Sequence, residues 1–273
     1  MKHKIIAAIL LPLVTFFSCT KESVKTKENK DIKRITLASN VQNWSAAANS
    51  SNPYDYVGLE HNKAAQHLVE NLSYGNLPNP QVNYNTVKTY VAANFNSTTA
   101  ANFNANTSAA LLSNILSNFG STLPTANNYA PVININTNLS AIAKGHITGL
   151  INQLLNPSNS ALDYNFYKSM IMNWENNISS VNVSQDDKKS MYMFASVIRY
   201  SLLLWKDVEY PDSSNGQLQL MKFKIRLFGW IATAVVDGAV AVGAAGLVTP
   251  LGSAALAAGA SGAVAAVCGI YNW

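Results

Sequence analysis

Apolar residues recur every three or four positions through the middle of this 273-residue chain, which is the period of an α-helix with one buried face. Strand-type alternation of apolar and polar residues is confined to the short segment 132–136. We therefore predict an all-α domain over residues 52–212. Six helices are expected there: after Asn52-Pro53, near 86–95, over 111–119, from about Asn138 to Pro157, after Asp163, and after Ser184.

The last of these helices carries a clear start signal. Ser184 followed by Asp187 fits a capping box, in which two side chains bond the free backbone groups of a helix's first turn. Tyr210-Pro211 ends the same helix, because proline does not continue a helix. Residues 213–222 are then expected to link the helical domain to the C-terminal segment.

The C-terminal segment, residues 223–273, consists largely of Ala, Gly, Val, Leu and Ile. Two apolar stretches, 225–248 and 251–271, meet at Thr249-Pro250, so we predict a helical hairpin. Small residues recur every four positions, which lets two helix backbones approach closely. The glycines expected in this packing are Gly238, Gly243, Gly259 and Gly262.

Each apolar stretch is also about long enough to cross a bilayer, which needs roughly 20 apolar residues. The single acid, Asp237, opposes a permanent span, because a carboxylate at the bilayer centre costs about 2.5–3.5 kcal/mol. It fits either a hairpin that inserts conditionally or a hairpin packed in protein. Basic residues and a tryptophan before the first stretch suit a membrane surface, and equally the start of a buried helix: Lys222, Lys224, Arg226 and Trp230.

The N-terminus has the layout of a secretory signal, with the basic residues Lys2 and Lys4 followed by an apolar run over 5–17. The sequence Phe16-Phe17-Ser18-Cys19 that ends the run resembles the lipobox of bacterial lipoproteins. This resemblance implies that the signal is removed and that Cys19 is acylated, for example with palmitate. An ordinary signal peptide with an incidental cysteine is the alternative.

The lipobox resemblance implies a domain order. Residues 1–18 would be the signal peptide, and residues 19–51 a flexible tether behind the lipid on Cys19. The tether is expected because 20–34 are polar and charged, with no apolar periodicity. Attachment through several acyl chains is stable, so the membrane is the expected partner.

The C-terminal tail carries a second resemblance. Residues 229–239 and the Gly/Ala-rich sequence after them resemble the glycine-zipper tails of bacteriocin-like proteins. The tail and the segment 52–62 also resemble small lipoproteins of Bacteroidetes-type bacteria, and Lys21-Glu22 resembles their surface-export signal. These resemblances imply no biochemical function. They imply a lipid-anchored protein of the cell envelope, expected at the outer membrane, with its periplasmic face and the cell surface left open.

Net charge and cysteine content argue against nucleic-acid binding, a disulfide and a cysteine metal site. The formal net charge is +5, and loss of Lys2 and Lys4 with the signal would lower it to +3. So small and scattered a surplus does not suit nucleic-acid binding. With Cys19 acylated only Cys268 remains, which leaves no disulfide within the chain and no cysteine metal site.

Two histidines are the main candidates for chemistry. His61 and His146 lie on the apolar stripes of the first and fourth expected helices, so both are predicted to be buried polar residues of the core. They could instead meet and share a metal with a carboxylate, although no spacing requires it. The motifs of metalloproteases, serine hydrolases and phosphate-binding loops are absent. We therefore predict no cofactor, no metal and no enzymatic activity.

Three functions remain open from the sequence. The first is a non-enzymatic envelope lipoprotein with a structural or interaction role, whose hairpin completes the core or binds a partner protein. The second is a membrane-active, bacteriocin-like protein whose hairpin inserts into bilayers. The third is an enzyme whose site escapes recognition.

Overall fold

The computed structural model describes most of the chain beyond its N-terminal region. The described residues are 36–37, 43–72, 76, 79–103, 113, 124–159, 163–206, 208–209, 218–245 and 248–271. At 36–37, 102, 208–209, 218–228 and 265–271 the description extends to the backbone alone. Cys19, the signal peptide and most of the helix expected over 111–119 lie outside the described residues. All described residues belong to one unit, Ile32–Trp273.

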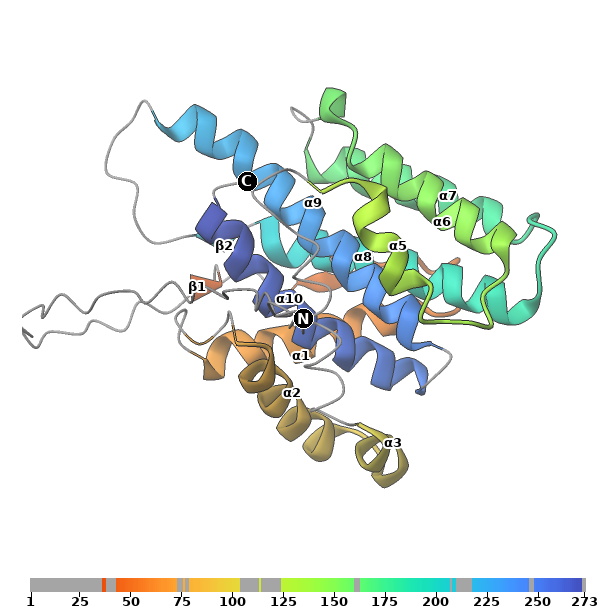
Figure 1. The fold of residues 1–273 in the computed structure, drawn as a ribbon, viewed down its shortest axis with the longest axis horizontal. Helices are drawn as coiled ribbons and strands as arrows, with labels where there is room; N and C mark the ends of the chain where they lie inside the picture. Colours follow the sequence, from red (N-terminus) through yellow and green to blue (C-terminus); the bar gives the residue numbers. More distant parts are fainter. Residues whose placement is uncertain are drawn as a thin grey trace, which may run out of the picture. The chain divides into compact units, whose positions relative to one another are not determined.

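The described residues confirm an all-α fold, drawn in Figure 1. The α-helices are α1 (Asp55–Asn71), α2 (Pro80–Asn94), α3 (Ser97–Asn102), α5 (Ala126–Ile133), α6 (Ala141–Leu154), α7 (Tyr164–Ile178), α8 (Gln185–Lys206), α9 (Leu218–Ala244) and α10 (Pro250–Tyr271). Two short 3-10 helices cover Trp44–Ala47 and Pro157–Asn159. The extended structure in the described part is a two-residue antiparallel pairing of β1 (Thr36–Leu37) with β2 (Val208–Glu209).

Side chains from the preceding residues start several helices where the sequence predicts them. Ser184 and Asp187 form the expected reciprocal pair, since the Asp187 N–H donates to Ser184 Oγ at 3.0 Å and the Ser184 N–H donates to Asp187 Oδ2 at 3.3 Å. Asp163 accepts from the backbone N–H of Phe166 at the start of α7. These bonds satisfy N–H groups that have no partner within the helix.

The C-terminal hairpin lies in the interior of the helical unit. Helix α9 packs against α10, α8 and α5, while α10 also packs against α1 and α2. Figure 1 shows α10 between α9 and α1. Every side chain or glycine at 231–244 and 252–264 is buried. Alanine and glycine allow this, because their small size lets the covering helices approach the hairpin backbone closely.

Three segments differ from their expected roles. Residues 43–51, assigned to the tether, include two buried residues: Asn49, and Ala47, which packs against Tyr200 and Leu203. Helix α9 begins at Leu218, so it takes in part of the expected linker 213–222. The alternating segment 132–136 starts inside α5, because Val132 and Ile133 bury one face of that helix.

Candidate functional site

Asp237, in the middle of α9, is fully buried and contacts three other helices. The hydroxyls of Ser201 in α8 and Ser261 in α10 each donate to Asp237 Oδ2 at 2.6 Å. His61 Nε2, from α1, lies 3.3 Å from the same oxygen. The second carboxylate oxygen, Oδ1, has no hydrogen-bond partner. A single side chain of the hairpin thus joins it to α1 and α8.

A second layer of hydrogen bonds holds these contacts. Trp205 Nε1 donates to Ser261 Oγ at 2.8 Å, and Asn62 Nδ2 donates to the backbone carbonyl of Tyr200 at 2.8 Å. Asn62 Oδ1 lies 2.9 Å from His61 Nδ1. The six side chains of this Asp237 cluster are all buried: His61, Asn62, Ser201, Trp205, Asp237 and Ser261.

Tyr84 of α2 borders the Asp237 cluster. Burial, and then the negative charge of Asp237, raise the pKa of the Tyr84 phenol far above its ordinary value. Its ring also lies directly against α10 at Gly259, where an added Cβ would stand closer than 3.0 Å to the ring carbons Cε1 and Cδ1. The glycine is therefore what allows α2 and α10 to pack at this distance.

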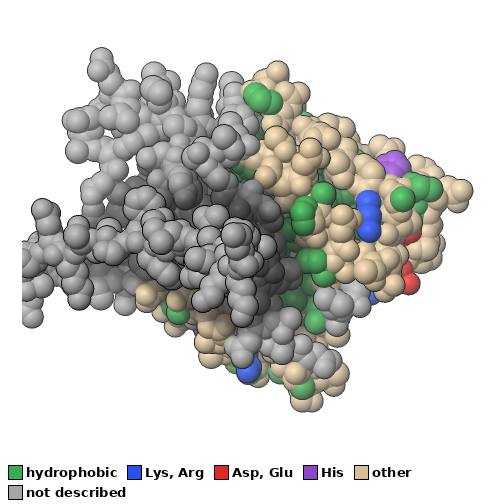
Figure 2. All heavy atoms as spheres, in the orientation of Figure 1, with side chains coloured by type: hydrophobic (Ala, Val, Ile, Leu, Met, Phe, Trp, Pro, Cys, Tyr) green, Lys and Arg blue, Asp and Glu red, His purple; other side chains and the backbone are tan. Residues whose placement is uncertain are grey.

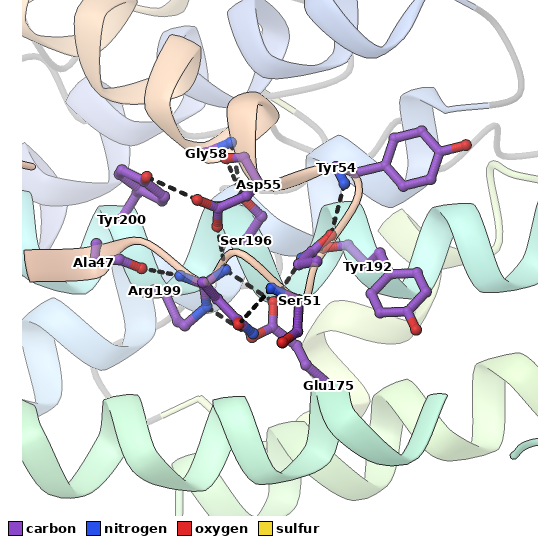
Figure 3. A network of polar contacts seen from close by, with 12 residues as sticks. Ala47, Ser51, Tyr54, Asp55, Gly58, Glu175, Tyr192, Ser196, Arg199 and Tyr200 are labelled. Carbon is purple, nitrogen blue, oxygen red and sulfur yellow. Dashed lines mark hydrogen bonds and ion pairs between the residues drawn. The ribbon is translucent and has the colours of Figure 1, made fainter. Parts of the chain in front are cut away.

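A second buried polar group, the Arg199 cluster, ties the chain before α1 to α7 and α8 (Figure 3). The Arg199 guanidinium contacts Glu175 through Nε–Oε2 and Nη2–Oε1, both at 2.9 Å. Its Nη2 also contacts Asp55 Oδ1 at 2.5 Å. Asn49 Nδ2 and Asn52 Nδ2 donate to Glu175 at 2.7 and 2.6 Å. Arg199 and Glu175 are almost wholly inaccessible to solvent.

The Arg199 cluster contains two carboxylates and one guanidinium. Burial works to lower the pKa of Arg199, but Glu175 and Asp55 outweigh burial and raise it. A hydrogen bond and the dipole of α1 help to stabilise the charge of the second carboxylate, Asp55. Tyr200 donates its hydroxyl to Asp55 Oδ2 at 3.1 Å, and Asp55 lies in the first turn of α1, where the helix dipole favours negative charge.

Helices α1 and α8 touch closely between the two clusters. The Gly58 N–H donates to Ser196 Oγ at 3.0 Å, and that hydroxyl donates to the backbone carbonyl of Asp55 at 2.8 Å. An added Cβ at Gly58 would lie 2.5 Å from the Ser196 carbonyl oxygen. Glycine at this position therefore lets polar groups of the two helices reach each other.

The glycines predicted to pack the hairpin are buried, and most of them contact parts of the helical body. An added Cβ at Gly238 would lie 2.6 Å from Ile198 Cγ1, and one at Gly243 would lie 2.5 Å from the Val132 carbonyl oxygen. Gly262 is buried as well. Gly238, Gly243 and Gly259 are closely packed, but their partners Ile198, Val132 and Tyr84 come from helices outside the hairpin. The expected packing of the two hairpin helices through these glycines stays a prediction.

The basic residues expected before the hairpin fall inside α9. Lys222, Lys224 and Arg226 belong to its first turns, in the part described by backbone alone. Trp230 is partly buried against the core. Of the helices that the structure describes, none combines the length and the apolar character needed to cross a membrane.

The two histidines do not share one environment. His61 is buried, as predicted, with its ring between Asn62 and Asp237. The prediction of a buried His146 is wrong, because this residue is exposed on α6. The buried face of α6 is formed by Ala143, Ile147, Leu150, Ile151 and Leu154, and His146 lies beside that face. Within the described part of the chain, no group of three or more His, Cys, Asp or Glu residues could hold a metal ion.

Sequence reasoning missed the Arg199 cluster. A signal for Arg199 does exist: it lies four residues after Ala195 and three before Leu202, both buried on α8, so a charged residue occupies the apolar stripe. A charge at such a position is buried and needs a partner. The partner itself cannot be read from the sequence, because Glu175 is on another helix.

The Asp237 cluster has the residue types of a hydrolase triad but not the arrangement. In a nucleophile–base pair, the serine hydroxyl bonds to the histidine. Here both serine hydroxyls donate to Asp237, and the ring of His61 faces Asn62 on its other side. All of these groups are enclosed by the surrounding helices.

The described surface has few features that suggest a site. A cavity of about 360 Å³ lies beside α5 and α6, lined by Pro124, Thr125, Ala126, Asn152, Leu155, Asn156, Pro157 and Ala232, none of which titrates. Figure 2 shows that the described part of one face carries mainly uncharged atoms, with charged side chains scattered over it. Comparison of the chain with protein-family models, curated proteins and solved structures finds no match.

Proposed function

We propose that this chain is a lipid-anchored envelope protein with a structural or interaction role, in which the C-terminal hairpin forms the core of the helical domain. The observation that carries the role of the hairpin is the contact of Asp237 with α1, α8 and α10. The lipid anchor is proposed from the lipobox-like sequence Phe16-Phe17-Ser18-Cys19. A hairpin kept for membrane insertion would have to break these contacts. It would also have to expose the apolar faces of the helices that cover it.

Further hydrogen bonds of the hairpin support this role, although the buried hydroxyl of Ser253 has no hydrogen-bond partner. Ser261 is bonded to Trp205 as well as Asp237, and Thr233 donates to the carbonyl of Gly229 within α9. The carbonyl of Ala232 accepts from the Tyr129 hydroxyl of α5 at 3.4 Å. The hairpin is thus joined to the covering helices by specific polar contacts in addition to apolar packing.

Flotation with liposomes tests this role of the hairpin. The chain from residue 20 onward, without lipid, is mixed with neutral or anionic vesicles at neutral and mildly acidic pH, and dye release is followed. We expect the protein to stay in the soluble fraction and the dye to stay inside. Flotation with dye release would contradict the proposal and favour the membrane-active, bacteriocin-like alternative.

The Asp237→Asn variant is the matched comparison in the same assay. An inserting hairpin would enter bilayers more readily without the carboxylate. A hairpin that serves as core would lose part of its stability and still release no dye. The two interpretations therefore predict different results for one substitution: more dye release for an inserting hairpin, and none for a hairpin that serves as core.

The anchor is tested separately through the two cysteines. When the chain is expressed in bacteria supplied with a labelled fatty acid, we expect the native chain to incorporate the label and Cys19→Ala to lose it. Cys268→Ala is the control and keeps the label. A labelled Cys19→Ala chain would contradict acylation at this residue. Protease treatment of intact cells then distinguishes the cell surface from the periplasmic face.

A further inference from the structure

The hydrogen bonds around Asn62 determine which ring nitrogen of His61 carries a hydrogen. The Tyr200 carbonyl can only accept, so the Asn62 amide nitrogen must point toward it, at 2.8 Å. The Asn62 oxygen then faces His61 Nδ1 at 2.9 Å. An amide oxygen is an acceptor, and Nδ1 must therefore be protonated.

The remaining ring nitrogen, Nε2, faces the carboxylate of Asp237 at 3.3 Å. It has no hydrogen-bond partner, so the contact is an ion-pair distance and not a well-aligned hydrogen bond. If Nε2 carried no proton, Nε2 and Asp237 Oδ2 would lie 3.3 Å apart in the interior with no hydrogen between them. That arrangement places two acceptors against each other in a medium of low polarity, which is costly.

The serines indicate where the extra proton lies. Trp205 Nε1 can only donate, so Ser261 accepts from it and turns its own hydrogen to Asp237 Oδ2. Ser201 donates to the same oxygen at 2.6 Å. Oδ2 thus accepts from two hydroxyls and carries no proton of its own. A proton on Oδ1 would find no acceptor, because Oδ1 has no partner.

We infer that His61 is doubly protonated in the folded chain and pairs with an ionised Asp237, so that the interior of the domain is a binding site for one proton. This proton holds α1 to the middle of α9. The inference does not depend on lipidation or on a partner. It makes the attachment of the hairpin sensitive to rising pH.

The sign of the effect follows from proton linkage. Histidine in an unfolded chain loses its second proton at about pH 6.5. In the protonated pair inferred above, the folded chain holds this proton between His61 and Asp237. Above that pH the folded state binds one proton more than the unfolded state, so stability falls as pH rises. Below it both states hold the proton, and the contribution of the pair is complete.

The side chains that the other helices present to Asp237 do not change charge between pH 6 and pH 9. Helix α2 presents Tyr84, whose phenol stays neutral because burial and Asp237 raise its pKa. Helices α8 and α10 present Ser201, Trp205 and Ser261, which do not titrate. Tyr129 of α5 also packs against α9 and donates its hydroxyl to the Ala232 carbonyl.

Asp237→Asn removes the negative charge that holds the proton and keeps nearly the same side-chain shape. The amide oxygen of asparagine can accept from both serines, and its NH₂ can donate to a neutral His61 Nε2. Denaturant unfolding of the full chain is measured from pH 6 to pH 9 for both proteins. The native folding constant is expected to fall up to tenfold per pH unit relative to the variant, in the range where one proton is released on unfolding.

Two controls and one spectroscopic measurement complete the test. His67→Gln and His146→Gln alter histidines away from Asp237, and we expect both to keep the native pH profile. The ¹⁵N spectrum of the native chain at pH 7 should show hydrogens on both ring nitrogens of His61. Parallel pH profiles of the native chain and Asp237→Asn would overturn the inference. A singly protonated His61 ring would overturn it even if the variant does not fold.

Discussion

Replacement of Gly259 by alanine tests whether the hairpin is the core of the domain. The new Cβ would lie within 3.0 Å of the Cε1 and Cδ1 atoms of Tyr84, whereas carbon atoms pack favourably at about 3.5–4.0 Å. Tyr84 is 1% exposed, so its ring cannot turn aside into solvent. Overpacking costs about 1–3 kcal/mol, and a Cβ so far inside contact distance belongs to the upper part of that range, about 2–3 kcal/mol. Alanine returns up to about 1 kcal/mol of helix propensity. We expect a net loss of about 1–2 kcal/mol, or roughly 2–8 °C in Tm.

Gly145→Ala on α6 is the matched control. An added Cβ there meets nothing within 4 Å, so the change removes only the flexibility of glycine and should stabilise the chain by about 0.5–1 kcal/mol. Both variants are compared with the native chain by urea unfolding followed by circular dichroism. If Gly259→Ala stabilised the chain as Gly145→Ala does, the Tyr84 ring would not lie against α10 and our account of the core would fail.

Two further predictions concern buried and exposed charges. Arg199→Leu leaves two acids without their guanidinium and should cost about 3–5 kcal/mol, whereas Lys63→Leu, which removes a partly exposed ion pair on α1, should cost at most about 1 kcal/mol. Equal costs in urea unfolding would contradict the assignment of Arg199 to the core. Burial works to raise the pKa of Asp187, but hydrogen bonds from Ser140 and Ser184 outweigh it and lower the pKa. Asp187 therefore adds stability at neutral pH that is lost as pH falls below about 3.9, so Asp187→Asn should unfold less steeply with acid. An unchanged acid transition in circular dichroism would count against these bonds.

Features that depend on neighbouring residues were predictable. The all-α class follows from apolar spacing, and the capping box at Ser184 and Asp187 follows from two side chains three residues apart. The close packing of the hairpin follows from glycines such as Gly238 and Gly259. In each case the interacting atoms are near in sequence or the requirement, small size, belongs to the residue itself.

The composition of the candidate site was only partly predictable. Asp237 stands out as the lone acid of an apolar segment, and its satisfaction at a helix contact was one of two alternatives. The apolar stripe correctly marked His61 as buried but wrongly included His146. The apolar stripe of a helix is about 100° wide, and a residue at its edge can be either buried or exposed.

By itself, the sequence indicated α1, α2, α6, α7, α8 and the two helices of the hairpin, together with the starts of α7 and α8, but it indicated neither α3 nor α5. Only the tertiary structure decided the partners of the buried charges and the location of the hairpin among α1, α2, α5 and α8. Arg199 reaches Glu175 across 24 residues of sequence and Asp55 across 144. Helix capping is encoded within one turn of chain, whereas a buried charge selects its partner from whichever helices pack around it. That choice depends on the packing of the whole domain.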